Sequence, residues 1–288
     1  MHCIVFLAEL EKNGICSIQD TSYYELTWGS LKFSIFGNNS NGLKAKLKSL
    51  NSAINFFNKP SCITIQESKL RQANSVKLQG YTIFEKNRMG LGGGLLTAVD
   101  QDLEPVLISD GGDENEILVV QANLGNQEIR IINAYGPQED EVEKSLSFWQ
   151  QLEAEAISAI EENCLTLIQL DANAKVGPGI IPYDCHAQSN NGIFLVEMIK
   201  RQNLFLLNAS DLCEGKITRH RVTKNGIERS TIDYIIVCEF MYRKLVKMVI
   251  DEDRIHTLTK YTTTCGVISK SESDHNPLFC QFDLPYTS

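Results

Sequence analysis

The sequence predicts an α/β (α+β) fold in which two packed β-sheets are flanked by helices. Short apolar runs recur along the chain between turn residues, and such runs are typical of strands. Only about three longer stretches have the apolar spacing of an amphipathic helix, and they are interleaved with the strands. This pattern indicates two sheets packed on each other with helices on the outside.

The chain is expected to form one domain with a large core. Its 288 residues are 43% hydrophobic and 22% charged, which is an ordinary globular composition. No stretch rich in proline, in glycine and serine, or in charge of one sign divides it. Residues 1–30 show no clear periodicity. We therefore expect an N-terminal extension of uncertain order there, followed by a single domain at 31–288.

The expected elements follow from the period of the apolar residues. A strand over 31–36 alternates apolar and polar residues, whereas a helix over 42–57 repeats apolar residues at helical spacing. A short apolar strand over 62–65 follows. Next come strands over 80–84, 93–99, 116–123 and 128–135, a helix over 141–162, a strand over 165–170, a helix over 191–202 and a strand over 204–207.

A basic hairpin is expected where two strand-like runs, 217–222 and 227–237, meet at Lys224-Asn225-Gly226. Asn-Gly between such runs favours a tight turn. Residues 216–229 hold five basic residues against one glutamate, and basic residues close to phosphates dominate affinity for DNA. The plainer interpretation is that a charged hairpin only keeps the protein soluble. Strands over 246–250 and 278–282 close the chain.

Composition excludes several classes of protein. The net charge of −9 and the pI near 5.2 argue against a non-specific nucleic-acid binder. Nine dispersed cysteines without a C-x-x-C pair indicate neither a disulfide framework nor a zinc knuckle. A reducing intracellular compartment, nucleus or cytoplasm, fits them best. The apolar run at 3–8 lacks a basic flank and is too short to span a membrane, so no targeting or membrane segment is expected.

Six polar fragments are scattered along the chain, nearly all at the end of a strand-like run. They are Asn39-Ser40-Asn41-Gly42-Leu43, Gln66-Glu67, Ala134-Tyr135, Asp171-Ala172-Asn173, Ser230-Thr231-Ile232-Asp233-Tyr234 and Ser273-Asp274-His275. Strand ends that converge in space are where such folds build a site. Carboxylates, amides, a tyrosine and a histidine suit hydrolysis by a metal-activated water.

In this order the fragments resemble the endonuclease/exonuclease/phosphatase superfamily, the group of deoxyribonuclease I and the abasic-site endonucleases. The resemblance covers about 31–282. The S-x-I-D-Y fragment after an exposed hairpin, with 132–137 and 171–175, is most similar to the endonuclease domain of non-LTR (LINE-type) retrotransposons. The chain departs from the family pattern at Asn38, where tryptophan or leucine is usual, and at Leu170, where glycine is usual.

The resemblance implies a four-layer sandwich of two mostly antiparallel sheets flanked by helices. It also implies a Mg²⁺-dependent phosphodiesterase, with Mn²⁺ as a substitute, that nicks DNA and leaves 3′-hydroxyl and 5′-phosphate ends. The implied partners are DNA and, if the chain is not a solo domain, the reverse-transcriptase region of a parent element. Two rivals stay open: a phosphatase acting on a small phosphoester such as a phosphoinositide, and a non-catalytic adopted domain.

The metal ligand expected first is Glu67, supported by Asn39 and Asn41, because carboxylate and amide oxygens suit hard Mg²⁺. By resemblance, Asp233 orients His275, and Asp274 is a supporting residue or a ligand of a second metal. The fragments alone allow plainer interpretations. A glutamate that ends a strand is usually a solvated surface residue.

Asp171 and Asn173 lie two apart, so in an extended segment they face the same side. Asp171 is expected to orient or deprotonate the water and Asn173 to donate to a phosphate oxygen, although D-x-N also forms ordinary turns. The sequence leaves open whether Asp171 or His275 takes the proton. Tyr135 is expected to bind the phosphate or the leaving oxygen. The expected substrate-binding residues are Asn208, Arg219, Arg221, Lys224, Arg229 and Ser230.

Overall fold

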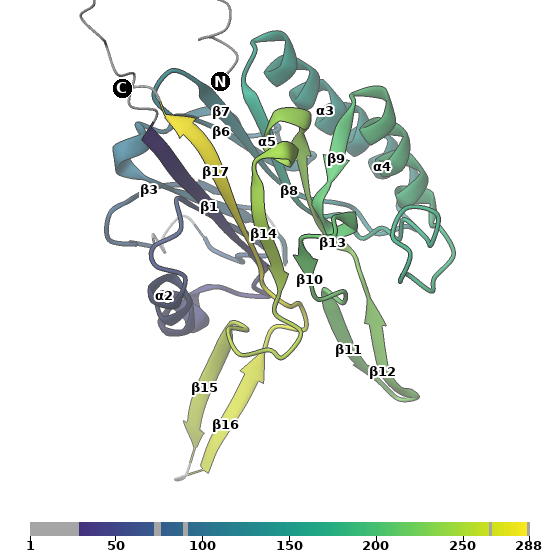
Figure 1. Cartoon of the computed structure of the whole chain (residues 1–288). Coiled ribbons are helices and arrows are strands. Elements are labelled where there is room, and N and C mark those ends of the chain that lie inside the picture. Colours follow the sequence, from purple (N-terminus) through teal and green to yellow (C-terminus); the bar gives the residue numbers. More distant parts are fainter. Residues whose placement is uncertain (1–28, 72–75, 89–91, 265–266, 287–288) are drawn as a thin grey trace, which may run out of the picture.

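The computed structural model describes residues 29–71, 76–88, 92–264 and 267–286, and two large sheets pack face to face in it (Figure 1). The first sheet has the spatial order β10 (Cys213–Glu214), β14 (Leu245–Ile250), β17 (Leu278–Tyr286), β1 (Gly29–Asn39), β2 (Cys62–Gln66), β4 (Leu95–Asp100) and β3 (Tyr81–Lys86). The second has the order β5 (Val106–Ser109), β6 (Glu116–Asn123), β7 (Glu128–Tyr135), β8 (Leu165–Asp171), β13 (Asp233–Cys238) and β9 (Leu204–Leu206). Most neighbouring strands are antiparallel; β1 with β2, β7 with β8 and β10 with β14 are parallel.

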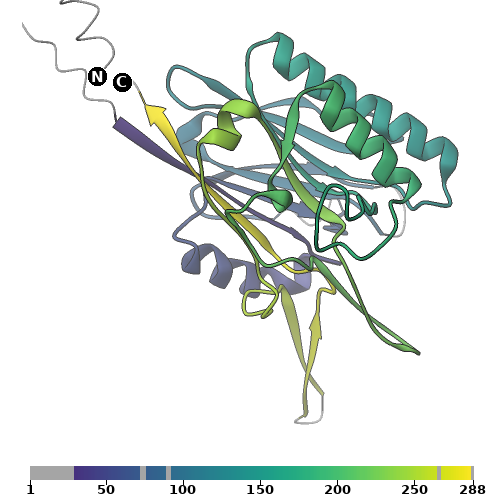
Figure 2. The same cartoon turned by 45° about the vertical axis from the view of Figure 1, so that its right-hand side comes forward.

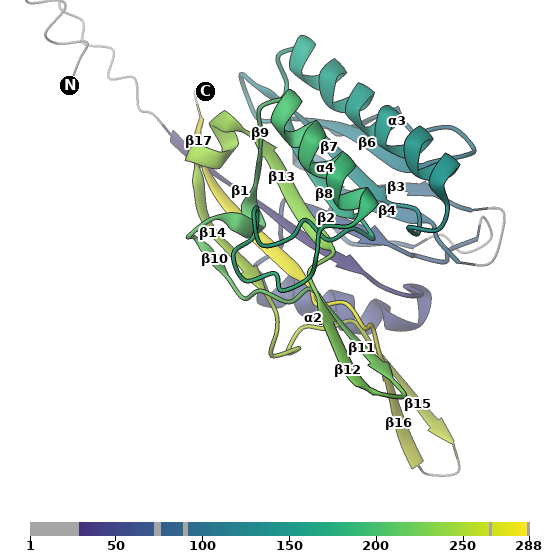
Figure 3. The same ribbon diagram turned by 90° about the vertical axis from the view of Figure 1, so that its right-hand side faces the viewer.

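Helices cover the outer face of each sheet and complete four layers. In Figure 3, α3 (Val142–Glu161) and α4 (Asn190–Arg201) lie over the second sheet, and α2 (Leu47–Phe56) lies beyond the first. The side chains of each strand point alternately to its two faces and fill the spaces between layers. Phe33 and Ile35 of β1 point into the core between the sheets, whereas Phe36 joins the cluster under α2. The expected sandwich of two packed sheets flanked by helices is therefore confirmed.

The long helices form for local reasons that the sequence makes visible. Phe148, Trp149, Leu152 and Ala156 of α3 are buried on one face against the second sheet. Ser189 caps α4 by accepting a hydrogen bond from the backbone N–H of Gly192, and basic residues occupy its last turn. Among the described residues, no helix is long and apolar enough to cross a membrane.

Some boundaries differ from those expected. β1 begins at Gly29, before the expected start of the domain, and residues 1–28 lie outside the described residues. A 3₁₀ turn at Lys44–Lys46 precedes α2, so the α-helix starts at Leu47 rather than near 42. The expected single strand over 227–237 breaks into β12 (Gly226–Ser230) and β13. The break occurs because the Thr218 hydroxyl accepts hydrogen bonds from the N–H groups that follow β12, at 2.9 and 3.1 Å.

Two hairpins project from the same edge of the sandwich (Figures 1 and 2). The first pairs β11 (Arg219–Thr223) with β12, and its turn, Lys224-Asn225 followed by Gly226 at the start of β12, lies at the tip where the sequence predicts it. The second pairs β15 (Thr259–Thr264) with β16 (Val267–Glu272) and was not expected from the sequence. Its strands are exposed on both faces, so they lack the alternation of apolar and polar residues that marks a half-buried strand. The short elements β5 and α5 (Glu239–Arg243) were also not expected.

Candidate active site

Strands from both sheets bring five of the six fragments to one place, and the loop before β17 brings the sixth. In the first sheet Asn39, the last residue of β1, pairs with Gln66 at the end of β2. In the second sheet Asp171, the last residue of β8, pairs with Tyr135 on one side and with Asp233 on the other. Register alone therefore sets the site residues of each sheet side by side.

Buried amides fix the two sheets together directly behind this place. Asn133 of β7 donates to the backbone carbonyl of Leu96 at 3.0 Å and to the hydroxyl of Thr97 at 3.2 Å, both on β4. Its carbonyl oxygen accepts a 2.7 Å hydrogen bond from the amide of Gln66. These groups are buried, so each cross-sheet bond restricts how the two halves of the site can shift.

Asn39 connects the carboxylates contributed by the two sheets. Its side-chain nitrogen lies 2.8 Å from Oδ2 of Asp171 and 3.1 Å from Oε1 of Glu67. The same Glu67 oxygen accepts a 3.0 Å hydrogen bond from the Tyr135 hydroxyl. Asn41 is joined to this group through its backbone N–H, which donates to Oδ1 of Asn39 at 3.0 Å. Four expected site residues thus form one hydrogen-bonded chain with Asn41 beside it.

The backbone at the site is held in the left-handed region at residues other than glycine. Asn41, Glu67, Lys69 and Asn173 have φ of 45°, 46°, 50° and 46°. This conformation costs a residue with a Cβ about 1–2 kcal/mol, least for asparagine. Four such residues at one place show that the surrounding hydrogen bonds determine how the site loops turn.

His275 is enclosed by two carboxylates. Its Nδ1 lies 2.9 Å from each oxygen of Asp233 and 3.8 Å from Oδ2 of Asp171. The histidine is 4% exposed and both aspartates are buried. Burial acts to lower the pKa of His275, but the charges of Asp233 and Asp171 outweigh it and raise this pKa to about 9. The imidazole is therefore protonated at neutral pH.

The pKa of Asp171 is shifted in the direction that favours its protonated form. Burial and the neighbouring Asp233 carboxylate raise the pKa of Asp171 to about 7, against the opposing effects of His275 and Asn39. A carboxyl group whose pKa lies near neutrality can both accept and release a proton at physiological pH. In contrast, burial and the nearby carboxylates raise the pKa of Tyr135, which keeps its phenol protonated and able to donate.

Glu67 is the most open carboxylate of the group. Its side chain is 21% exposed, and Lys69 forms an ion pair of 3.0 Å with its second oxygen. Partial burial opposes ionisation, but hydrogen bonds from Asn39 and Lys69 lower the pKa of Glu67 overall. Glu67 is therefore ionised at neutral pH and can be reached from solvent.

The remaining expected residues lie around this centre in two groups. The first group supports it. Asn173 donates to the carbonyl of Gly136 at 2.8 Å, and the amide of Asn208 binds the backbone of β13 at 3.0 and 3.1 Å. Asp274 pairs with Nε of Arg219 at 3.0 Å, so Arg219 lies at the base of the hairpin.

The second group lies on the hairpin and is not brought to the centre. Arg221, Lys224 and Arg229 are exposed farther along β11–β12, and half-buried Ser230 ends β12 opposite Arg219. Their exposure leaves the three basic side chains available to a partner outside the carboxylate group.

Several residues that build the site were not expected from the sequence. Lys46 is 4% exposed and donates to the carbonyls of Ser40 and Asn41, so it holds the loop after β1. Burial lowers the pKa of Lys46 to about 8. A lysine among helical residues carries no signal of such a role. The sequence could have indicated Lys69 as a site residue, because it lies two residues after Glu67.

Two sets of ligand atoms are available for a metal ion. Asp171, Asp233 and His275 offer atoms within 4.8 Å of one another, so this group could bind a metal. However, the Asp233 oxygens are already hydrogen-bonded to Nδ1 of His275. Glu67 and Asn39, with Asp171 beside them, form the second set. Their carboxylate and amide oxygens fit a hard divalent cation, and the exposed edge of Glu67 leaves room for its waters.

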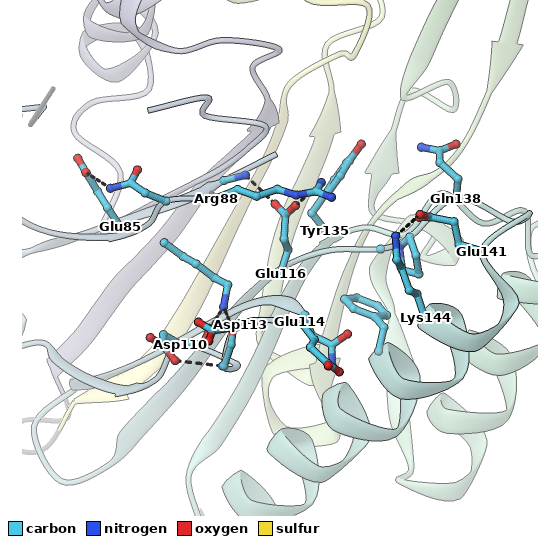
Figure 4. Close-up of a pocket in the computed structure, with 18 residues that line it drawn as sticks. Glu85, Arg88, Asp110, Asp113, Glu114, Glu116, Tyr135, Gln138, Glu141 and Lys144 are labelled. Atoms are coloured by element: carbon cyan, nitrogen blue, oxygen red, sulfur yellow. Dashed lines mark hydrogen bonds and ion pairs between the residues drawn. The ribbon is translucent and has the colours of Figure 1, made fainter. Parts of the chain in front are cut away.

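A pocket of about 910 Å³ adjoins the site beyond Tyr135. Figure 4 shows Arg88 extended over Glu116 beside Tyr135; the two side chains are 3.1 Å apart. Six acidic and three basic residues line the pocket: Glu85, Asp110, Asp113, Glu114, Glu116 and Glu141, with Lys86, Arg88 and Lys144. The excess of carboxylates makes this side of the site unfavourable for phosphates.

No protein-family model matches the chain, and no curated protein matches it in sequence. The endonuclease domain of TRAS1, a telomere-specific non-LTR retrotransposon, superimposes with a TM-score of 0.65 at 20% identity, over 88% of this chain and 99% of that domain. The AP endonuclease LMAP from Leishmania major gives 0.66 at 16% identity, over 88% of each chain. The catalytic domain of Xenopus laevis APE2 gives 0.66 at 15% identity, over 89% of this chain and 94% of that one. The chain therefore has the endonuclease/exonuclease/phosphatase (deoxyribonuclease I-like) fold.

Proposed function

We propose that this protein is a Mg²⁺-dependent phosphodiesterase that nicks DNA. The observation that carries the proposal is the convergence of Glu67, Asn39, Asp171 and the Asp233–His275 pair at one edge of the sandwich. It combines oxygen ligands that solvent reaches through Glu67, a proton acceptor and a cationic donor, and these groups suit phosphodiester hydrolysis by water.

The metal is assigned to Glu67 and Asn39, with Asp171 beside them. When bound, Mg²⁺ supplies neutralisation of the negative charge that develops on the phosphate and the leaving oxygen. Asn39 holds both carboxylates in place through its side-chain nitrogen. Its side-chain oxygen therefore faces the metal site only when the amide group is rotated. Lys69 and Tyr135 restrict Glu67 to one orientation.

Proton transfer is assigned to the Asp171–Asp233–His275 group. Asp171, whose pKa is raised toward neutrality, accepts the proton of the attacking water. His275 carries a positive charge, because its pKa is raised to about 9, and donates to a phosphate oxygen. Asp233 keeps the ring oriented through Nδ1. The charged carboxylate behind the ring stabilises the imidazolium.

Support for DNA as the substrate comes from charge and from the similar structures. Residues 216–229 carry five basic side chains against one acidic one, whereas the whole chain carries −9. The similar structures include the endonuclease domain of a retrotransposon and, by name, an AP endonuclease. The reverse-transcriptase region of a parent element is the protein partner that we propose. The six described cysteines are free thiols, which suits a reducing compartment.

The test is nicking of supercoiled plasmid by the wild-type protein in Mg²⁺ and in EDTA. Nicking in Mg²⁺ that is lost in EDTA and in His275→Ala would support the proposal. His186→Ala, which removes a more exposed imidazole on the loop before α4, is the matched control and should nick normally. If folded wild type fails to nick but hydrolyses a small phosphoester, the substrate assignment is wrong. If it hydrolyses neither, the chain is a non-catalytic domain.

A further inference from the structure

The hairpin β15–β16 is joined directly to the proposed catalytic histidine. β16 ends at Glu272, and Ser273, Asp274 and His275 follow without a break. The backbone N–H of Ser273 donates to the carbonyl of Leu258 at 3.0 Å, which closes the base of the hairpin. On the other side, Arg219 of β11 bridges to His275. The bases of both hairpins therefore flank one residue of the site.

The base of β15–β16 is firmly anchored. Leu258 is fully buried in the core under α2, and Thr257 accepts a 3.3 Å hydrogen bond from the hydroxyl of Ser49. Arg254 donates to Oδ1 of Asn276 at 3.0 Å and pairs with Glu272 at 3.6 Å. The direction in which the hairpin projects is thus fixed by the body of the protein.

Beyond its base, the hairpin is exposed on both faces. Tyr261, Val267 and Ile268 are 63%, 67% and 70% exposed. A two-stranded ribbon without a covering layer is marginally stable in water, and it gains little from burying its own side chains. The ribbon therefore offers the side chains of both faces to a partner.

The chemistry of the ribbon fits the backbone of a nucleic acid. Lys260 and Lys270 lie on it, with hydroxyls at Thr262, Thr263, Thr264, Ser269 and Ser271. Its acidic residue, Glu272, lies at the base between Arg254 and Lys270, and these three side chains together keep one positive charge. Lysine, serine, threonine and tyrosine side chains are among the groups that contact phosphates. The acidic pocket beyond Tyr135 favours entry of phosphates from the hairpin side instead.

The dimensions also fit. The DNA major groove admits a two-stranded β-ribbon. Each strand has six residues, and at about 3.4 Å per residue the ribbon reaches roughly 20 Å from its base. That length corresponds to roughly six base pairs of duplex along one flank of the cut.

We propose that β15–β16 is a second DNA-binding arm, which lies along duplex DNA on one side of the scissile phosphate and contacts its backbone through Lys260 and Lys270. This inference rests on the proposed nuclease function. The two hairpins then hold the duplex at the same edge of the sandwich. β15–β16, which leads directly into His275, positions the phosphate that is cut.

The test compares two variants with the same loss of charge. Lys260→Gln with Lys270→Gln removes two charges from the ribbon. Lys32→Gln with Arg243→Gln removes one charge near the start of β1 and one from α5. The start of β1 and α5 lie at the end of the molecule opposite the hairpins (Figure 1). Affinity for a duplex is measured in EDTA from 50 to 200 mM salt. The ribbon variant should lower the slope of log K against log salt by about one to two, because each lost phosphate contact removes about 0.9.

The control variant should keep the wild-type slope. Equal slopes for the two variants would overturn the inference, as would occur if the ribbon binds a protein or a lipid instead. Failure of the proposed function is distinct, because it is measured by the loss of Mg²⁺-dependent nicking by wild type and not by the salt slopes of the variants. A second measurement uses duplexes shortened from each end around a mapped nick. Wild type should lose affinity when one flank falls below about six base pairs, and the ribbon variant should not.

Discussion

At the scale of single residues, the pair formed by Asp233 and His275 controls the charge of the site. Asp233 is buried, and both of its oxygens face Nδ1 of His275, so its charge acts on the imidazole at short range. Asp171 adds to the same effect at 3.8 Å. Replacement of Asp233 is therefore expected to alter the charge of His275 rather than only its orientation.

Asp233→Asn should reduce nicking about 10²–10⁴-fold and shift the alkaline limb of its pH profile toward lower pH. The carboxylate that raises the pKa of His275 is lost while the shape of the side chain is kept, so the imidazolium loses its proton earlier. The measurement is the initial nicking rate from pH 6 to 10. An unchanged alkaline limb in the variant would show that His275 does not act as a cation.

The stability of the metal-free protein should also depend on His275. Its pKa rises from 6.5 to about 9 on folding, so its stabilising effect is complete below pH 6.5 and is lost as the pH rises through 9. The free energy of unfolding in EDTA should therefore fall between pH 7 and 9, as measured by urea titration. His275→Gln should flatten this decline; an equal decline in both proteins would assign it to another group.

At the scale of elements, the first hairpin has a base and a tip with different expected roles. Arg219 at the base holds Asp274 beside His275, whereas Arg221 and Lys224 are exposed and lie farther along. Exposed basic side chains contribute to binding, and a residue that orients a site group affects turnover.

Arg219→Ala should therefore lower kcat more than it raises KM for an intact duplex. Arg221→Ala with Lys224→Ala should raise KM, flatten the salt dependence of binding and leave kcat within about twofold of wild type. Steady-state kinetics on a defined duplex separates the two outcomes. The assignment of roles fails if the base variant changes KM alone.

Close contact between β7 and the turn after β8 makes Gly136 critical. A Cβ at this position would lie 2.6 Å from the carbonyl oxygen of Ala172, next to Asp171, and backbone cannot move aside as a flexible side chain can. Gly136→Ala should lower Tm and reduce nicking together. Gly179→Ala is the matched control, because its Cβ would meet no atom within 4 Å. Thermal unfolding and plasmid nicking of both variants provide the test.

The sequence predicted the strands and helices whose apolar residues are buried in the core. The apolar run of β8 ends at Asp171 because the strand leaves the core there, and α4 begins after a serine cap. It did not predict β15–β16, because a ribbon exposed on both faces has no apolar periodicity. Nor did it predict the site contacts of Lys46 or the pairing of Arg219 with Asp274, which join residues distant in sequence.

At the scale of the whole molecule, charge is distributed unevenly around the site. Both hairpins leave one edge, the first of them strongly basic, and the acidic pocket lies beyond Tyr135. Duplex DNA is therefore expected to lie mainly over the hairpins. Footprinting of metal-free protein on a mapped nick site should show protection extending farther on one flank than on the other. Symmetric protection would contradict this orientation.

β17 lies in the interior of the first sheet, between β14 and β1, although it comes after all the other strands in the sequence. A ribosome must therefore synthesise the protein through β17 before this sheet can close, and His275 is made only just before that strand. Nascent chains contain Asn39 and Glu67 early but have no complete site. The order of synthesis thus keeps the proposed nuclease inactive until the sandwich can fold as a whole.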